Sequence, residues 1–138
     1  MEDNFKFKGR RRILASELKK KGILNNQIIN SIETIPRHLF IDPGLSEQAY
    51  IDKALPIDSN QTISQPYTVA FQTQLLNPLP GEKILEIGSG AGHFLKACEN
   101  SGVNAIGYES NVDLVKIGKK QLKKWKQTLL NLLLFQLQ

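Results

Sequence analysis

The sequence has only one cysteine, Cys98, so an intrachain disulfide is impossible, and such sparse use of cysteine is typical of a reducing compartment. It also has no apolar run close to the roughly 20 residues that a membrane span requires. Its first stretch, MEDNFKFKGRRR, lacks the apolar core of a secretory signal. We therefore expect a cytoplasmic protein with no membrane partner.

The net charge of +5 is concentrated in two places. Eight of the 18 basic residues fall in residues 6–21 and six, all lysine, in residues 116–126. Residues 22–115 contain four basic and ten acidic residues, a net charge of −6. Charge runs on helices usually form solvated faces, whereas nucleic-acid surfaces bring aromatic rings between the cations. Trp125 is the one aromatic residue of the lysine run, and we expect no nucleic-acid partner.

The first eighty residues have the pattern of a helical segment. The stretch RRRILASELKKKG, residues 10–22, predicts a helix that stops at Gly22. The stretch NNQIINSIETIP predicts a second helix, capped by Asn25 or Asn26 and ended by Pro36. Residues 44–63 show no clean period and are interpreted as loop with a short strand at KALPI.

Helices and strands alternate in the rest of the chain. Pro66 is placed to begin a helix, with Phe71 and Leu75 spaced four apart on one face. KILEIG then predicts a buried strand, AGHFLKACENSG a helix and VNAIGYE a second strand. The next helix, SNVDLVKIGKKQLKKWK, begins with an S-x-x-D capping box of Ser110 and Asp113. This order predicts an α/β fold, Rossmann-like, with a parallel sheet over residues 81–138 after a helical segment over residues 1–80.

A glycine-rich turn joins the first predicted strand of the sheet to its helix. LEIGSGAG places Gly88, Gly90 and Gly92 where glycine permits a tight turn and the close approach of a ligand. A dinucleotide fingerprint would need a third glycine where His93 stands, and the Gly-Lys-Ser/Thr of a phosphate loop is missing.

Two acidic residues indicate which ligand this turn would bind. Glu86, two residues before Gly88, would repel a pyrophosphate but attract ammonium and sulfonium charge. Glu109 ends the second strand, the position from which an acid binds ribose hydroxyls. Together with the glycine turn they indicate S-adenosylmethionine. Taken singly, Glu86 could be a surface acid at a strand end and Glu109 a solvated residue before a helix cap.

The stretch QTISQPYTVAF, residues 61–71, raises a second alternative. Ser64 precedes the predicted helix start at Pro66, so its hydroxyl could cap that helix or belong to an active site. His38 and Cys98 are interpreted as structural, and His93 as a residue that lines the ligand pocket.

The chain resembles the protein-L-isoaspartate O-methyltransferases, class I S-adenosylmethionine-dependent methyltransferases, from about Arg12 to Lys123. The resemblance lies in RRILASELKKKGI, IPRHLFI, AYIDKALPI, QTISQPYTVAFQTQLL and KILEIGSGAGHF, in that order. TISQPY ahead of the glycine turn is the most specific of these. The resemblance implies a Rossmann-like methyltransferase fold and transfer of a methyl group to the α-carboxylate of L-isoaspartyl residues in damaged proteins, which are then the partners.

The resemblance also implies the roles of the site residues. Ser64 would be the catalytic hydroxyl, and Gln61, Thr62 and Ile63 would lie along the cofactor. The methionine end of the cofactor would be held by Glu86 and the loop, Gly88, Ser89, Gly90 and Gly92, and its ribose by Glu109.

The sequence departs from the family at its end. After LVKIGKKQLKKWK comes QTLLNLLLFQLQ, which does not resemble the later strands and helices of such enzymes. LLNLLLF can form a strand, giving an incomplete sheet, or the tail can be translated out of frame. The alternatives to a repair methyltransferase are accordingly a truncated, non-catalytic fragment of one, or a class I methyltransferase with another substrate.

Overall fold

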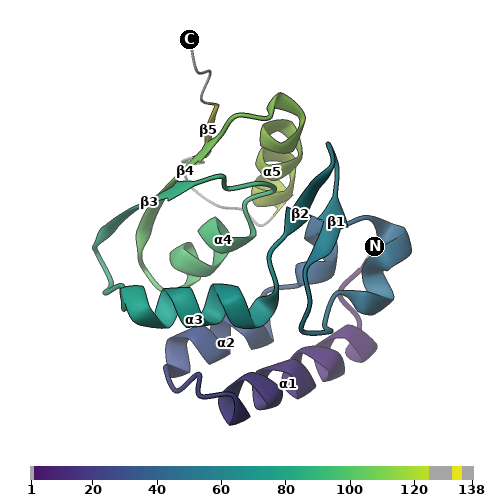
Figure 1. Cartoon of the computed structure of the whole chain (residues 1–138), viewed down its shortest axis with the longest axis vertical. Helices are drawn as coiled ribbons and strands as arrows, with labels where there is room; N and C mark the ends of the chain where they lie inside the picture. Colours follow the sequence, from purple (N-terminus) through teal and green to yellow (C-terminus); the bar gives the residue numbers. More distant parts are fainter. Residues whose placement is uncertain (1, 125–131, 135–138) are drawn as a thin grey trace.

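The computed structural model describes residues 2–124 and 132–134. Trp125 lies outside these residues. The helical segment packs below and beside a three-stranded sheet (Figure 1). The elements in chain order are α1 (Phe5–Lys20), α2 (Asn26–Thr34), the 3-10 helices η1 (Arg37–Phe40) and η2 (Pro43–Gln48), β1 (Leu55–Ile57), β2 (Gln61–Ile63), α3 (Pro66–Leu76), β3 (Lys83–Ile87), α4 (His93–Asn100), β4 (Asn104–Glu109), α5 (Val112–Lys124) and β5 (Leu132–Leu134).

The first two helices begin and end at local signals. The Asn4 side chain accepts a hydrogen bond from the Phe7 amide, so α1 begins five residues before the predicted Arg10. Helix α1 ends just before Gly22, whose φ of +94° is the left-handed conformation that favours glycine. Asn25 caps α2, as one of the two predicted alternatives. The end at Gly22 and the cap at Asn25 were predictable because each depends on neighbours in sequence, whereas the cap at Asn4 was missed.

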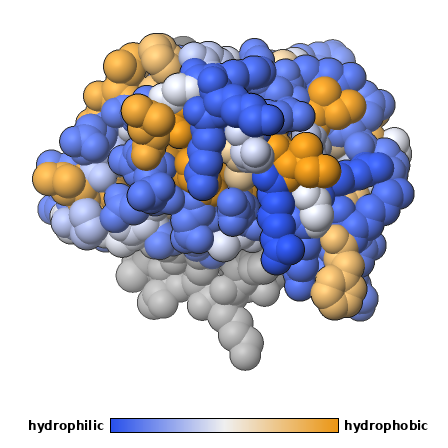
Figure 2. Space-filling view, turned by 90° about the horizontal axis from the view of Figure 1, so that it is seen from below, coloured by the Kyte–Doolittle hydropathy of each residue, from blue (hydrophilic) through white to orange (hydrophobic). Residues whose placement is uncertain are grey.

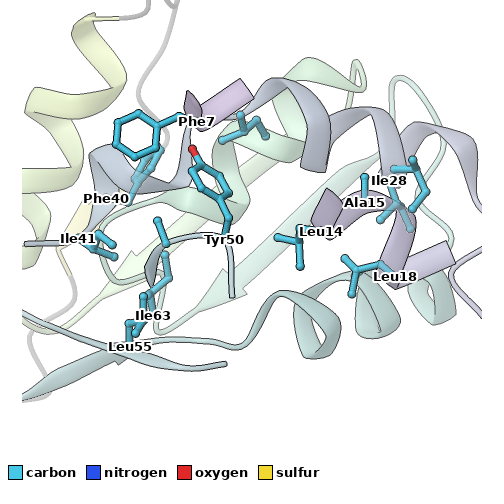
Figure 3. Packing of buried hydrophobic residues seen from close by; sticks show 14 of the residues in the cluster. Phe7, Leu14, Ala15, Leu18, Ile28, Phe40, Ile41, Tyr50, Leu55 and Ile63 are labelled. Atoms are coloured by element: carbon cyan, nitrogen blue, oxygen red, sulfur yellow. The ribbon is translucent and has the colours of Figure 1, made fainter. Parts of the chain in front are cut away.

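The core of the helical segment is shared by α1, α2 and the 3-10 helices. Leu14, Leu18 and Ile23 are fully buried there, and Figure 3 shows Leu14 and Leu18 with Ala15 and Ile28. His38 is structural, as predicted: its ring stacks on Phe7 at 3.9 Å between centroids, and its Nδ1 lies 2.6 Å from the Tyr50 hydroxyl.

One ion pair ties the amino-terminal residues to this core. The buried guanidinium of Arg11 donates to both carboxylate oxygens of Asp3, at 2.7 and 2.8 Å. It also donates to the Tyr50 hydroxyl and to the Glu33 carbonyl. The other basic residues of α1 mostly face solvent, and Figure 2 shows this face as largely hydrophilic with separate apolar patches. This agrees with the prediction of a solvated basic face.

The prediction of mostly loop over residues 44–63 was wrong in two respects. The 3-10 helix η2 fills the first part, and β2 was missed altogether. Strands β1 and β2 form an antiparallel hairpin in which Leu55 pairs with Ile63 and Ile57 with Gln61. Its turn has left-handed Ser59 and Asn60, with φ of 62° and 55°. Such turns favour hairpins, but the usual sequence signal is Asn-Gly, which this chain lacks here.

The sheet is parallel, in the order β3-β4-β5. The parallel α/β order predicted from the sequence is therefore present, and the tail does form a strand at β5. Helices α4 and α5 contribute Leu95, Cys98 and Val115 to one cluster with Ile84 of β3 and Ala105 of β4. Both helices thus cover the same face of the sheet.

Two predictions about burial and capping were wrong. Strand β3 is not buried throughout, because Leu85 and Ile87 on its second face are exposed. Helix α5 is capped by Asn111 and not by Ser110: the Asn111 side chain accepts from the amides of Asp113 and Leu114.

Two further features of the fold concern the cysteine and the length of the helices. Cys98 is a buried core residue, as predicted, and burial raises the pKa of its thiol to about 12. Within the described residues, no helix has the length and apolar character needed to span a membrane.

Candidate cofactor and substrate site

One pocket joins the stretch that contains Ser64 to the glycine turn, which follows it about twenty residues later in the sequence. Its walls come from the end of β2 and from the glycine turn after β3, which meet above the first turn of α4. Seven of its lining residues were predicted as site residues: Thr62, Ile63, Ser64, Glu86, Gly88, Ser89 and Gly90. Ile57, Val69, Ala91, His93 and Phe94 complete the lining. The tertiary structure therefore brings most of the predicted site together.

Ser64 lies on the pocket and does not cap α3. The cap position of α3 is Gln65, whose side chain makes no capping hydrogen bond. The open amide of Tyr67 is bound instead by Asp52, whose Oδ1 accepts at 2.8 Å. The capping alternative for Ser64 is thus wrong, and its hydroxyl is available to a ligand.

Asp52 is a positioning residue that sequence reasoning missed. Its carboxylate binds Lys21 Nζ as well as the Tyr67 amide, and its carbonyl accepts from Gln65 Nε2 at 3.2 Å. Burial acts to raise the pKa of Asp52, but the bonds from Lys21, Tyr67 and Gln65 together lower it below its usual value. No local signal marks this residue, because it lies fifteen positions before the amide that it binds.

The glycine turn has the conformation that its composition predicts. Gly88, Gly90 and Gly92 all have positive φ, at 76°, 53° and 81°. The Gly88 amide donates to the Tyr108 carbonyl of β4 at 2.8 Å, which holds the turn against the neighbouring strand. Ser89 is buried beneath the turn, and its hydroxyl donates to the Glu86 carbonyl at 3.2 Å.

Glu109 braces the turn from the end of β4. Its Oε2 accepts from the Gly90 amide at 2.7 Å and its Oε1 accepts from the Asn111 amide at 2.9 Å. Each carboxylate oxygen can accept a second hydrogen bond, so the side chain can still bind hydroxyl donors. Glu109 is buried, which contradicts the alternative of a solvated residue before a helix cap.

Glu86 is the group in the pocket that most clearly requires a partner. Its Oε2 is buried and has no hydrogen-bond partner among the described residues. Burial raises the pKa of Glu86 to about 7, with a further contribution from the negative charge of Glu109. Because an unpaired buried carboxylate is costly, this oxygen fits a cationic donor such as an ammonium group.

Three predicted site residues do not line this pocket. Gln61 is exposed on β2, Gly92 is buried where α4 begins, and Glu109 is buried at the end of β4. His93 lines it, as predicted, with its ring edge-on to Phe40 at 5.3 Å. Burial lowers the pKa of His93 to about 3, so its imidazole is neutral near pH 7.

The described residues provide no group of three or more His, Cys, Asp or Glu side chains able to hold a metal ion. What they provide is a parallel β-α-β unit with a glycine turn at one strand end and an acid at the next. This arrangement defines a Rossmann-like nucleotide-binding fold. Comparison with solved structures makes the class more specific.

Two solved structures share this architecture. One is a protein-L-isoaspartate O-methyltransferase with a TM-score of 0.76 and 23% identity, which covers 91% of this chain and 41% of that chain. The other is a Plasmodium falciparum structure assigned to PCMT, in complex with S-adenosyl-L-homocysteine. It has a TM-score of 0.70 and 27% identity, and covers 95% of this chain and 62% of that one. The fold is thus that of a Rossmann-like methyltransferase, with an incomplete sheet in the described residues.

The sequence comparisons identify the family. The family model of protein-L-isoaspartate(D-aspartate) O-methyltransferase (PCMT) matches residues 9–136. The chain belongs to this family, and the match extends beyond the Arg12 to Lys123 predicted from motifs, through β5 to residue 136.

Curated relatives are considerably longer than this chain. The protein-L-isoaspartate O-methyltransferase of Cytophaga hutchinsonii is 46% identical over 123 residues, which are 89% of this chain and 56% of that protein. That of Flavobacterium psychrophilum is 52% identical over 93 residues, 67% of this chain and 44% of that protein. The chain therefore spans about half the length of the relatives that it matches.

Proposed function

We propose that this chain binds S-adenosylmethionine and transfers its methyl group to the α-carboxylate of L-isoaspartyl residues in damaged proteins. The observation that carries the proposal is the pocket in which Ser64, free of any capping role, meets Glu86 and the glycine turn. Family membership and the ligand of the Plasmodium falciparum structure support the cofactor.

The residues of the pocket fit this cofactor by their chemistry. The unpaired Oε2 of Glu86 suits the ammonium of the methionine end, and Glu109 can accept from ribose hydroxyls. The cofactor-binding set that we propose is Gln61, Thr62, Ile63, Ser64, Glu86, Gly88, Ser89, Gly90, Gly92 and Glu109. Gln61 and Gly92 belong to it as neighbours of the pocket-lining residues, and Glu109 through its hydrogen bond with the Gly90 amide.

Methyl transfer to a carboxylate depends on the positioning of the two reactants more than on a strong base. When bound, the cofactor supplies a methyl group on a positively charged sulfur, which is a good leaving group. A carboxylate is already ionised near pH 7, so no base needs to activate it. Ser64 would donate a hydrogen bond that orients this carboxylate, while the apolar side chains of Val69 and Phe94 exclude water from the pocket.

We also propose a domain boundary, a class of partners and a compartment. We place the boundary near residue 80, between a segment that carries the substrate loop (1–80) and the cofactor-binding half (81–138). The partners are proteins or peptides that contain L-isoaspartyl residues. The compartment is the cytoplasm, where a single buried thiol such as that of Cys98 stays reduced.

The test is a comparison of Ser64→Ala with Ser16→Ala, a control on the exposed face of α1. Titration with S-adenosylhomocysteine measures binding, and methylation of an isoaspartyl peptide measures turnover. Ser64→Ala should lower turnover about tenfold or more and leave the affinity for S-adenosylhomocysteine within about twofold. Unchanged turnover would contradict the role of Ser64, and a folded wild-type chain that binds no S-adenosylhomocysteine would contradict the proposed function.

A further inference from the structure

The imidazole of His93 is a polar group of the pocket that the proposed reaction leaves without a role. His93 is the first residue of α4 and lines the pocket together with Ser64 and Glu86. The ring of Phe40 packs edge-on against the imidazole. Neither ring nitrogen has a hydrogen-bond partner among the residues that the structure describes, so both can bind a ligand.

This imidazole is neutral. Burial, with a further contribution from the positive charge of Arg37, lowers the pKa of His93 to about 3. Near pH 7 the ring therefore carries one N–H donor and one acceptor nitrogen. A neutral imidazole can donate a hydrogen bond to an anion without placing a second positive charge beside Arg37.

The surroundings of His93 favour an anion. Arg37 lies close enough for its charge to act on the imidazole, and it is only 3% exposed. Its Nη2 donates to the Lys53 carbonyl at 3.4 Å, but its Nε and Nη1 have no hydrogen-bond partner within the described part of the chain. Burial lowers the pKa of Arg37 to about 10, so the guanidinium stays charged near pH 7. An unpaired buried cation is stabilised when an anion binds nearby.

Helix α4 acts in the same direction. The helix begins at His93, so the positive end of its dipole faces the pocket at this residue. None of the described residues that line the pocket is a lysine or an arginine. An anion bound on this side of the pocket is therefore held by neutral donors, with the charge of Arg37 behind them.

The reactants of the proposed function each supply such an anion. S-adenosylmethionine has a carboxylate beside its ammonium group, and the L-isoaspartyl residue has the α-carboxylate that accepts the methyl group. Glu86 suits the ammonium and repels a carboxylate, which leaves the side of His93 for the negative groups. We infer that His93 donates a hydrogen bond to a carboxylate bound in this pocket. The inference rests on the proposed function, because both carboxylates belong to its reactants.

Two pairs of ligands distinguish the two carboxylates. The first pair is S-adenosylhomocysteine and its decarboxylated analogue, which keeps the ammonium group but lacks the carboxylate. The second pair is an L-isoaspartyl peptide and the same peptide with an α-carboxamide in place of the α-carboxylate, both titrated in the presence of S-adenosylhomocysteine. Calorimetric titration gives the ratio of affinities within each pair. The contribution of Glu86 cancels in the first ratio, because both ligands carry the same ammonium group.

The variants are His93→Phe and His93→Gln. His93→Phe removes the donor and keeps a ring against Phe40, and it should lower the affinity ratio of one pair about tenfold or more. The pair that responds identifies the carboxylate. His93→Gln retains an N–H donor and should restore most of the ratio, which a purely packing role of the ring would not allow.

The wild-type chain provides a measurement that does not depend on the folding of a variant. The chain has two histidines, so the imidazole nitrogen signals of His93 can be followed by NMR. They should shift when the carboxylate ligand of the responding pair binds, and shift much less with its analogue.

Three results would overturn the inference. Unchanged ratios for both pairs in a folded His93→Phe chain would do so and would leave the proposed function intact. Equal losses in His93→Phe and His93→Gln, or imidazole signals that respond alike to a ligand and its analogue in both pairs, would show that the ring only packs. A folded wild-type chain that binds none of the four ligands would contradict the proposed function, and the inference with it.

Discussion

Replacing Gly107 by alanine should disturb the glycine turn from beneath. Gly107 lies in the middle of β4, and a Cβ atom built there would lie 2.3 Å from Ser89 Oγ, 2.7 Å from Leu95 Cδ1 and 2.9 Å from Ser89 Cβ. All three distances are far below ordinary contact. The Leu95 methyl group can rotate away, but Ser89 is held in the turn by its hydrogen bonds to strand carbonyls.

The magnitude follows from the cost of overpacking. A methyl group forced into a filled interior costs about 1–3 kcal/mol, and we expect a value near 2 kcal/mol because one of the two neighbours can yield. For a chain of this size that free energy lowers the melting temperature by roughly 4–8 °C. The affinity for S-adenosylhomocysteine should fall as well, since Ser89 lines the pocket.

The measurement is thermal and urea unfolding of Gly107→Ala beside Gly9→Ala. Gly9 lies in α1 with no atom within 4 Å of its would-be Cβ, so alanine there should stabilise the chain by about 0.5–1 kcal/mol. If Gly107→Ala unfolds at the wild-type temperature, the close packing of α4 on β4 is refuted. If it is less stable but binds S-adenosylhomocysteine normally, the link from β4 to the turn is refuted.

Three other perturbations test the site and its support. Asp52→Ala should destabilise the chain by about 1–2 kcal/mol through loss of the cap on α3. The stability that Asp52 contributes is present above about pH 4 and should be lost as the pH falls through its lowered pKa. Equal stability of wild type and variant at pH 7 in urea titration would contradict this. Burial raises the pKa of Glu86 to about 7, so the wild type should lose stability as the pH rises from about 4.5 through 7. Glu86→Gln should not show this loss. Parallel curves of stability against pH for the two proteins would exclude a buried Glu86. Arg11→Met should cost about 2 kcal/mol by leaving buried partners unpaired, against no change for exposed Arg12→Met.

Features set by neighbouring residues were predictable from the sequence. The cap at Asn25, the stop at Gly22 and the strand-turn-helix around Gly88 each depend on a few adjacent positions. The capping box at Ser110 failed because Asn111, one residue on, competes for the same amides. The hairpin was missed since its turn places Ser59 and Asn60 in the left-handed conformation without the Asn-Gly or Asp-Gly pair that usually signals a hairpin.

By itself, the sequence determined the α/β order, the glycine turn and the acids placed at two strand ends. Only the tertiary structure decided that Asp52 caps α3 and so leaves Ser64 to the pocket, and that Leu85 and Ile87 of β3 are exposed. The physical reason is distance along the chain. Periodicity and capping act over a few residues, whereas the partner of a buried carboxylate or of a sheet face is chosen by packing between segments that the sequence keeps far apart.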